Sequence, residues 1–472
     1  FPLSFTNNML REQQTVEVIL SALKSKDTPQ CPHGPTLLFE QANASNVKRY
    51  FACSACRDKK ACSFYQLEGE KISKEKCEAR KAINAAAQPK RTQAEYRDRS
   101  AKYMQLPVSS RKFCETCSLL LLPSEWSQHM GHVVHQNMSA EMLQTPSELM
   151  KSIEDSKTNA QYLFAQSAID FVLETMENLK VTHALCVGSP RIHENLQKLS
   201  QVNSLLLDLD HRYGQFFDTC KYGRYNMFNH HFFENSRESY LDFLKRAVQG
   251  RLLLIVDPPF GGLVEVLAHT FNCISEDFEK LGGKGFSESD GMNLMFFFPY
   301  FNESQILTHM PYLRMADYKV NYDNHGLFKS GSKMKQGSPI RIFTNLRLLS
   351  FVLPTEEGYR YCDKCQKYVS LENQHCKICD SCTSKDGRTY VHCNKCNRCV
   401  KPARIHCDQC NQCCTKDHKC GDAKPGACFS CGGYGHKKKE CPYKKQLQIM
   451  SKSKRKAKNE TQTEKGKKKR RK

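Results

Sequence analysis

The chain has 472 residues, 39% of them hydrophobic, with 26 cysteines and a formal net charge of +22. This length suits more than one domain, since a domain has roughly 150 residues, and the low hydrophobic content means that core burial alone does not hold the whole chain. No run of residues approaches the ~18 apolar residues that span a bilayer, and the N-terminus has no signal-peptide pattern. We therefore expect neither a membrane protein nor a secreted disulfide-bonded one.

The first 78 residues predict an N-terminal helix over 1–27 and a small zinc-bound sheet over 28–78. The second segment holds a Cys-x-His pair, an aromatic-x-Cys strand and a Cys followed by paired aromatics, a set that suits one tetrahedral zinc ion beside β-strands. It resembles the GRF-type zinc finger, which implies a grip on single-stranded nucleic acid. The implied ligands are Cys31, His33, Cys53 and Cys62. Cys56 is a spare thiol that could replace one of them.

Residues 79–110 are rich in charged residues and predict an exposed, basic helical linker. Residues 111–137 predict a zinc finger with two cysteines and two histidines, because a Cys-x2-Cys pair precedes three histidines. The expected ligands are Cys114, Cys117 and His129 with either His132 or His135. Three to five residues usually separate the two histidines, which favours His135.

Residues 155–353 are almost free of cysteine and alternate apolar strands with helices, which predicts an α/β domain. Three strands end in a turn or in acidic residues, at 183–188, 204–210 and 251–257. Because ligands bind beyond the carboxyl ends of the strands in a doubly wound sheet, we expect one pocket there.

The sharpest chemical signal is the sequence Asp257-Pro258-Pro259-Phe260. Two prolines cannot continue a strand, and their fixed φ angles hold carbonyl oxygens in an outward arc. The Asp carboxylate, those carbonyls and the Phe ring would form a slot that suits an aromatic amine, which offers two N–H donors and a face for stacking. Phosphates and carboxylates would be repelled there.

This motif resembles the fourth motif of the amino-methyltransferases in the Rossmann-like, S-adenosylmethionine-dependent class. The resemblance implies catalytic roles for Asp257, Pro258, Pro259 and Phe260. It implies that the entry segment, the first-strand turn, the acid that binds the ribose and the adenine contacts form the cofactor site, namely Gln161, Tyr162, Leu163, Phe164, Gly188, Arg191, Asp208, Asn226, Met227 and Asp257. The first motif departs from the class, because Gly188 stands alone where a Gly-x-Gly run is usual.

From Cys362 onward the chain repeats Cys-x2-Cys pairs with histidines at ligand spacing, which favours zinc over disulfides. We predict a Cys/His-rich ladder over 356–422, resembling the cysteine-rich domain of DHHC palmitoyltransferases. Its interleaved sets are Cys362, Cys365, His375 and Cys382, then Cys376, Cys379, His392 and Cys399, then Cys393, Cys396, His406 and Cys413. Cys407, Cys410, His418 and Cys420 could form a fourth set. We interpret the ladder as a structural platform that zinc binding folds.

Residues 426–443 resemble a retroviral CCHC zinc knuckle, with ligands Cys428, Cys431, His436 and Cys441. Such knuckles bind unpaired RNA by stacking bases on aromatic residues. Residues 444–472 predict a disordered basic tail, which fits phosphate binding and import into the nucleus or nucleolus. A solubilising tail is the alternative.

In the order of its modules, nearly the whole chain resembles the family of N6-adenosine methyltransferases of large-subunit ribosomal RNA. The resemblance implies S-adenosylmethionine and several structural Zn²⁺ ions as cofactors, an unpaired adenosine in structured ribosomal RNA as target, and His132 as the fourth ligand of the second finger. We expect a monomer in the nucleus, nucleolus and cytoplasm, acting on naked RNA or on a pre-ribosomal or ribosomal particle. The alternatives are a multi-zinc RNA-binding adaptor with an inactive methyltransferase fold, and a ubiquitin ligase or acyltransferase built on the ladder.

Overall fold

The structure is a computed structural model that describes residues 15–25, 27–42, 47–55, 61–152, 161–199, 201–287, 290–324, 338–418 and 420. The chain divides into two compact units. The first contains Phe1–Leu371 and Lys385–Gly387, and the second contains Glu372–Ser384 and Arg388–Lys472. Within the described ranges, no helix is both long enough and apolar enough to cross a bilayer.

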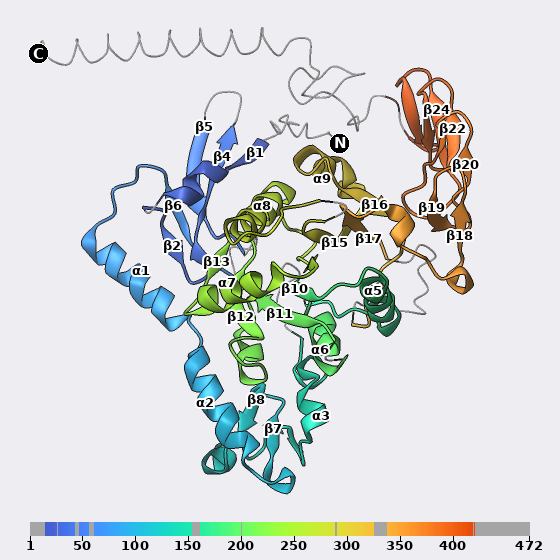
Figure 1. Ribbon diagram of the computed structural model, residues 1–472. Coiled ribbons are helices and arrows are strands. Elements are labelled where there is room, and N and C mark those ends of the chain that lie inside the picture. The colour runs from blue at the N-terminus through green and yellow to red at the C-terminus, as the bar shows by residue number, and fades with distance from the viewer. Residues whose placement is uncertain are drawn as a thin grey trace, which may run out of the picture. The chain divides into compact units, whose positions relative to one another are not determined.

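An eight-stranded sheet forms the centre of the first unit (Figure 1), in the order β13-β12-β11-β10-β14-β15-β17-β16. Its strands are β10 His183–Val187, β11 Asn203–Asp208, β12 Tyr222–Asn226, β13 His231–Phe232, β14 Leu252–Val256, β15 Asn293–Pro299, β16 Arg314–Ala316 and β17 Ile340–Thr344. The neighbours from β12 to β15 pair in parallel, whereas β13, β16 and β17 pair antiparallel to theirs. The sequence order reverses between β10 and β14, which makes this edge the expected place for a ligand.

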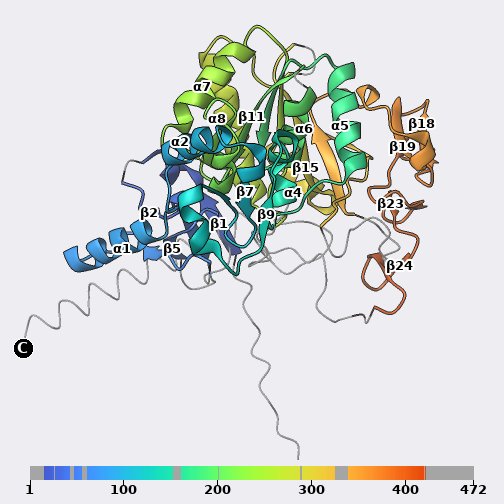
Figure 2. The same cartoon turned by 90° about the horizontal axis from the view of Figure 1, so that it is seen from below.

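Helices cover both faces of this sheet (Figure 2). One face holds α5 (Gln166–Asn178) and α6 (Pro190–Leu199), and the other holds α7 (Ser236–Ala247), α8 (Val264–Lys280) and α9 (Glu303–His309). Successive residues of a strand point to opposite faces, so the fully buried β10 supplies both hydrophobic cores, one through Ala184 and Cys186 and the other through Leu185 and Val187. The predicted α/β, Rossmann-like fold class is confirmed.

The first finger, predicted over 28–78, extends back to residue 15 in the structure and adds a four-stranded antiparallel sheet in the order β1-β4-β5-β6 and a short hairpin, β2-β3. The elements are β1 Thr15–Ile19, a 3₁₀ turn Leu20–Lys24, β2 Gln30–Cys31, β3 Gly34–Pro35, β4 Leu37–Ala42, β5 Val47–Ala52 and β6 Tyr65–Leu67. The expected helix over 1–27 is therefore wrong for residues 15–19. Those residues are rich in β-branched side chains, which suit a strand, and all five pair with residues 38–42 of β4.

The linker consists of two helices, α1 (Lys74–Ala86) and α2 (Gln93–Met104). The first buries no residue, as expected of an exposed helix. The second buries Tyr96 and Tyr103, and the Gln93 amide donates to the carbonyl of Tyr222 at 2.9 Å. The expectation of an exposed linker is thus wrong for α2, because its two tyrosines are buried against other elements of the first unit.

The second finger, residues 111–137, consists of a three-stranded sheet and a 3₁₀ helix. These are β7 Lys112–Cys114, β8 Leu119–Leu121, β9 Val134–Gln136 and η3 Pro123–His129, followed by the short helices α3 Ala140–Leu143 and α4 Pro146–Leu149. Phe113 and Leu120 join the core beneath α5 and α6, whereas Leu37 and Phe39 of the first finger join the core beneath α7 and α8. Each finger therefore extends one face of the central domain.

The ladder is a series of two-stranded hairpins. In the first unit β18 (Tyr359–Cys362) pairs with β19 (Lys367–Ser370). In the second unit the hairpins are β20 His375–Cys376 with β21 Ser381–Cys382, β22 Val391–Cys393 with β23 Arg398–Val400, and β24 Arg404–Cys407 with β25 Gln412–Thr415. The predicted knuckle and basic tail lie outside the described residues.

Candidate active site

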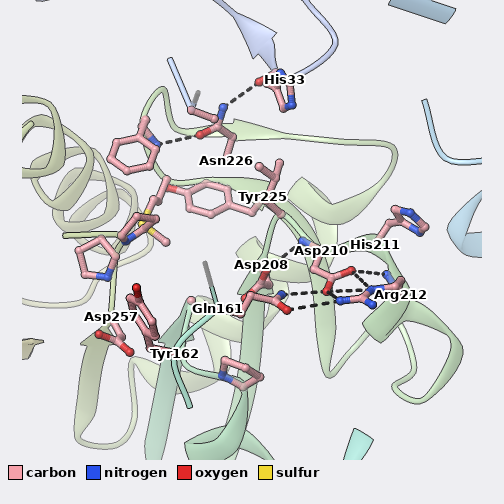
Figure 3. A pocket seen from close by; sticks show the side chains of 18 of the residues that line it. His33, Gln161, Tyr162, Asp208, Asp210, His211, Arg212, Tyr225, Asn226 and Asp257 are labelled. Carbon is pink, nitrogen blue, oxygen red and sulfur yellow. Dashed lines mark hydrogen bonds and ion pairs between the residues drawn. The ribbon is translucent and has the colours of Figure 1, made fainter. Parts of the chain in front are cut away.

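A cavity of about 480 Å³ lies at the carboxyl ends of β10, β11 and β14, beside the point where the strand order reverses. Figure 3 shows the side chains that line it. The predicted site residues in its lining are Gln161, Tyr162, Leu163, Gly188, Asp208, Asn226, Met227, Asp257, Pro258, Pro259 and Phe260. The structure therefore brings together segments that are up to 100 residues apart in the sequence, as expected from the strand ends.

The Asp-Pro-Pro-Phe segment follows β14 directly. The amide of Asp257 donates to the carbonyl of Val187 at 3.1 Å, and the amide of Gly262 closes the turn by donating to the carbonyl of Pro259 at 2.8 Å. The hydroxyl of Tyr322 donates to Oδ1 of Asp257 at 2.9 Å. Burial raises the pKa of Asp257 well above its ordinary value, and the Tyr322 hydrogen bond opposes this shift only in part. The carboxyl group is thus held in one orientation and its neutral form is favoured.

Two aromatic rings, those of Tyr162 and Phe260, line the cavity, and the buried ring of Tyr322 packs against both. The ring of Phe260 stacks on Tyr162, with 5.5 Å between centroids and 21° between planes. Tyr322 meets Phe260 edge-on at 5.9 Å and Tyr162 at 6.1 Å. The amide of Leu163 and the carbonyl of Gln161 both bond the side chain of Asn324, at 2.8 and 2.6 Å. The entry segment that carries Tyr162 is therefore anchored beside the catalytic turn.

Gly188 occupies the turn after β10 with φ = +64°. A Cβ atom there would lie 2.9 Å from the carbonyl oxygen of Asp257 and 2.8 Å from Cε of Met227. Only glycine fits both the left-handed conformation and the space. A single glycine thus forms the turn at a position where the methyltransferase class usually has a Gly-x-Gly run.

Two acids at the end of β11 have different roles. Asp210 is engaged with the side chains of Arg212 at 2.7 Å and Gln161 at 2.8 Å. Asp208 lines the cavity, and its Oδ1 accepts the amide of Asp210 at 2.8 Å. Burial and the neighbouring Asp210 charge raise the pKa of Asp208 to about 7. Its carboxylate is the acceptor that hydroxyl groups of a ligand could satisfy.

Two predicted cofactor residues lie outside the cavity lining. Phe164 is 2% exposed and stacks on Tyr322 at 5.1 Å. Arg191 donates to the carbonyl of Phe164 at 2.5 Å and to Asp323 at 2.6 Å. The structure therefore does not place these two side chains in the cavity lining, and their contact with a cofactor stays a prediction. Arg191 contacts the entry segment through the carbonyl of Phe164, and an isolated backbone bridge links Phe164 to Tyr322.

Tyr225 and Phe228, which flank the expected adenine contacts, also line the cavity. The sequence interpretation did not assign the other lining residues to the cofactor site, namely His33, Ala55, Pro190, Leu209, Asp210, His211 and Arg212. Most of them adjoin predicted residues, so neighbourhood in the sequence could have found them. His33 and Ala55 are different, because they belong to the first finger. Asn226 donates to the carbonyl of His33 at 2.8 Å and to the hydroxyl of Ser54 at 2.9 Å, a contact that no sequence pattern indicates.

In the first unit, two predicted metal sets come together as groups whose ligand atoms lie within 4.8 Å of one another: Cys31, His33, Cys53 and Cys62, and Cys114, Cys117, His129 and His132. In the second set, Nδ1 of His132 lies 3.5 Å from the sulfur of Cys114 and 3.4 Å from that of Cys117. His135 instead contacts Glu115 at 2.9 Å. The structure brings His132 rather than His135 to the cysteines, because β9 directs His135 away from them.

In the second unit, two ladder sets are grouped in the same way: Cys376, Cys379, His392 and Cys399, and Cys393, Cys396, His406 and Cys413. The Cys379–Cys399 and Cys396–Cys413 sulfur distances are 3.8 and 3.6 Å. Thiolates on one tetrahedral zinc ion are about 3.8 Å apart, given Zn–S bonds of about 2.3 Å. Both groups are therefore of the right size for zinc.

The first and fourth ladder sets differ in how far the structure describes them. Cys407 and Cys420 have their sulfurs 3.5 Å apart, and His418 lies 3.6 Å from Cys410 and 3.2 Å from Cys420. The set Cys362, Cys365, His375 and Cys382 takes two residues from each unit and stays a prediction. The knuckle ligands Cys428, Cys431, His436 and Cys441 lie outside the described residues.

A repeated backbone conformation accompanies the Cys-x2-Cys pairs. In five of them the residue after the second cysteine has φ between 45° and 49°: Ser118, Gln366, Asp380, Asn397 and Asn411. Such a φ is uncommon outside glycine, and Asn and Asp tolerate it best. The amides of Cys117 and Cys379 also point at the sulfurs of Cys114 and Cys376, at 3.4 Å each. This turn directs both sulfurs of a pair to one point, as a shared metal ion requires.

Comparisons with known proteins agree with this geometry. The sequence model of a family described as "Probable N6-adenine methyltransferase" matches residues 155–340. The rRNA N(6)-adenosine-methyltransferase ZCCHC4 of Homo sapiens is 47% identical over 445 residues, 92% of this chain and 86% of the relative. The proteins of the same name from Mus musculus and Xenopus tropicalis are each 44% identical, over 92% and 91% of this chain and 86% and 89% of the relatives. The predicted family is confirmed, and the chain belongs to the rRNA N(6)-adenosine-methyltransferases.

Proposed function

We propose that this chain transfers a methyl group from S-adenosylmethionine to the N6 amine of an adenosine in large-subunit ribosomal RNA. The observation that carries the proposal is the single cavity in which the Asp257–Phe260 turn faces the acid at the end of β11. The relatives' name specifies the same reaction on ribosomal RNA.

The residues around the cavity fit the cofactor. Asp208 would accept the ribose hydroxyls, the usual role of an acid at this position, and Gly188 lets the turn after β10 pack closely against Asp257 at the edge of the cavity. Met227 and Phe228 would contact the adenine, and Tyr162 would cover the site from the entry segment. The cofactor supplies a methyl group on a positively charged sulfur.

The protein's part of the reaction is to orient a weak nucleophile. The lone pair of an adenine amine is delocalised into the ring, so Asp257 and the Pro258 carbonyl would hold its two hydrogens and turn the lone pair out of conjugation. Proximity and alignment then account for much of the rate. Burial favours the neutral form of Asp257, whose carbonyl oxygen can still accept a hydrogen bond. The proton leaves after methyl transfer, so no strong base is needed beforehand.

The target adenosine must be unpaired or flipped out, because base pairing hides its amine. It would enter against Phe260, whose ring already stacks on Tyr162 at 5.5 Å. A base that stacks on Phe260 would therefore displace Tyr162 or extend its stack.

The Cys/His group of the second finger would hold a structural Zn²⁺ ion outside the reaction centre, since none of its members is in the lining of the described cavity. The other Cys/His groups would hold structural Zn²⁺ ions as well. The first finger, the CCHC knuckle and the basic tail would grip the RNA. We further propose that the protein acts as a monomer in the nucleus, nucleolus and cytoplasm, on ribosomal RNA that is naked or within a ribosomal particle.

The test is incubation of the purified chain with methyl-labelled S-adenosylmethionine and total RNA, followed by nucleoside analysis of each RNA species. We expect label in N6-methyladenosine from large-subunit ribosomal RNA, and none with Asp257→Ala beyond about one hundredth of the wild-type rate. Label in another nucleoside, or RNA binding with no transfer, would refute the proposal; the second result would identify an inactive adaptor.

A further inference from the structure

The first finger reaches the cofactor cavity through the hairpin β2-β3. Its tip holds His33, which lines the cavity, and Gly34, which has φ = +88°. A Cβ atom on Gly34 would lie 2.4 Å from the His231 ring, so the hairpin fits closely against β13. Ala55, three residues from the strand β5, is 7% exposed and lines the same cavity. One wall of the cavity thus comes from outside the methyltransferase domain.

Asn226 joins this wall to the domain. It ends β12, is 1% exposed, and uses both sides of its amide (Figure 3). The nitrogen donates to the carbonyl of His33 and to the hydroxyl of Ser54, at 2.8 and 2.9 Å. The oxygen accepts the amide of Phe228 at 3.0 Å. Since Asn226, Ser54 and Phe228 are buried, leaving their polar groups unpaired is costly.

Phe228 extends the connection to the catalytic turn. A Cβ atom on Gly262 would lie 2.9 Å from the Phe228 ring, and the amide of Gly262 closes the turn on Pro259. On the other side, Thr270 of α8 donates to the carbonyl of Met227 at 2.8 Å. The loop 226–228 is therefore held between the finger, α8 and the catalytic turn.

We propose that the first finger is a structural wall of the cofactor pocket, and that Asn226 is the positioning residue that makes cofactor binding depend on the fold of this finger. The inference rests on the proposed function, because it names a role in cofactor binding. The four candidate zinc ligands flank both contacts of Asn226: His33 is itself one of them, and Ser54 follows Cys53. Metal binding to this set fixes the two segments that Asn226 contacts.

The chain offers a matched pair of variants. Asn229 also donates to the hairpin, to the carbonyl of Pro35 at 2.7 Å and, with a longer bond of 3.4 Å, to the carbonyl of His33, but it does not line the cavity. We expect Asn226→Ala and Asn229→Ala to lower the melting temperature alike. Only Asn226→Ala should raise the Kd for S-adenosylhomocysteine, about tenfold or more, as the loss of a buried hydrogen-bonded amide predicts. Calorimetric titration of the full chain with S-adenosylhomocysteine measures this Kd.

Two further variants leave every atom of the cavity lining in place. Ser54→Ala removes one acceptor of Asn226 and should raise the Kd about three- to tenfold. Cys62→Ala removes a candidate zinc ligand and should raise the Kd while lowering the zinc content by one ion. Arg49→Ala is the control within the same finger, because Arg49 pairs with Glu40 and Glu68 in solvent; it should leave the Kd unchanged.

The results separate the two proposals. If the wild-type chain does not bind S-adenosylhomocysteine, the proposed function fails. If the wild type binds and folded Asn226→Ala and Ser54→Ala bind equally well, the coupling is refuted. Equal increases in Kd for Asn226→Ala and Asn229→Ala would refute the positioning role of Asn226, because any loosening of the hairpin would then have the same effect.

Discussion

At the scale of single residues, Asp257 tests whether the turn after β14 orients an amine or only ends the strand. Asp257→Ala removes the acceptor and should lower the methylation rate about 10²–10³-fold. Asp257→Asn should retain more activity, because burial favours the neutral acid and an amide copies its carbonyl oxygen. Initial rates on ribosomal RNA measure both, with zinc content as a control for folding. Alanine outperforming asparagine would contradict the hydrogen-bond account.

Asp208 predicts how cofactor binding depends on pH. Its pKa of about 7 means that the carboxyl group gains a proton as the pH falls below 7, and a carboxylate accepts ribose hydroxyls better than the neutral acid. Affinity for S-adenosylhomocysteine should therefore rise up to about tenfold between pH 6 and pH 8. Titration calorimetry at several pH values tests this. The same rise in Asp208→Asn would assign the dependence to another group.

At the scale of elements, α2 is tied to the second finger by a two-pronged ion pair. Arg99 donates to both carboxylate oxygens of Glu125 at 2.7 Å and to the carbonyl of Leu120 at 2.9 Å. Both side chains are mostly buried, with 18% and 16% exposed. Such forked pairs are strong, so α2 is part of the fold and not a linker.

Arg99→Ala should therefore lower the free energy of unfolding by about 1–3 kcal/mol, as urea denaturation would measure. Although burial opposes it, the pairing with Arg99 lowers the pKa of Glu125. The stabilisation is thus present above the unfolded pKa of about 4.5 and is lost as the pH falls through the lower folded value. Arg99→Lys keeps the charge but not the forked hydrogen bonds, so its free energy of unfolding should lie between those of Arg99→Ala and the wild type. If Arg99→Ala is as stable as the wild type at pH 7, the stabilising role of the Arg99–Glu125 pair is contradicted.

At the scale of the whole molecule, metal analysis tests the modular interpretation. The first unit has two groups of suitable size and the second unit has two among the described residues, and the sequence adds the remaining ladder sets and the knuckle. We expect at least five zinc ions per chain by mass spectrometry or elemental analysis. One ion or fewer would refute the ladder assignment.

The C-terminal region separates RNA binding from cofactor binding. Residues 442–472 carry a net charge of +12 from 14 Lys and Arg against two Glu. Deleting residues 423–472 should weaken RNA binding and reduce its dependence on salt, because fewer phosphate contacts release fewer counterions. Binding measured at two salt concentrations, together with the Kd for S-adenosylhomocysteine, tests this. Weaker binding of S-adenosylhomocysteine with unchanged RNA affinity would mean that the modules are assigned the wrong way round.

The sequence alone determined the parts of this protein whose chemistry is local. The Asp257–Phe260 turn, the acid at the end of β11 and the Cys-x2-Cys pairs are short patterns, and their residue types dictate what they can bind. The α/β fold followed from the alternation of buried strands and helices, because the side-chain period depends only on the backbone.

Only the tertiary structure decided which of these parts meet. Arg191 and Phe164 have the sequence positions expected of cofactor residues. In the structure Arg191 pairs with Asp323 and Phe164 stacks on Tyr322, and neither side chain is in the lining of the cavity. Residues 15–19 form a strand because β4 is there to pair with them. In α2, the spacing of the tyrosines along the sequence does not show whether they are buried or exposed. The contact of Asn226 with His33 joins residues 193 positions apart. Such contacts depend on the packing of whole modules, and packing leaves no periodic signal in the sequence.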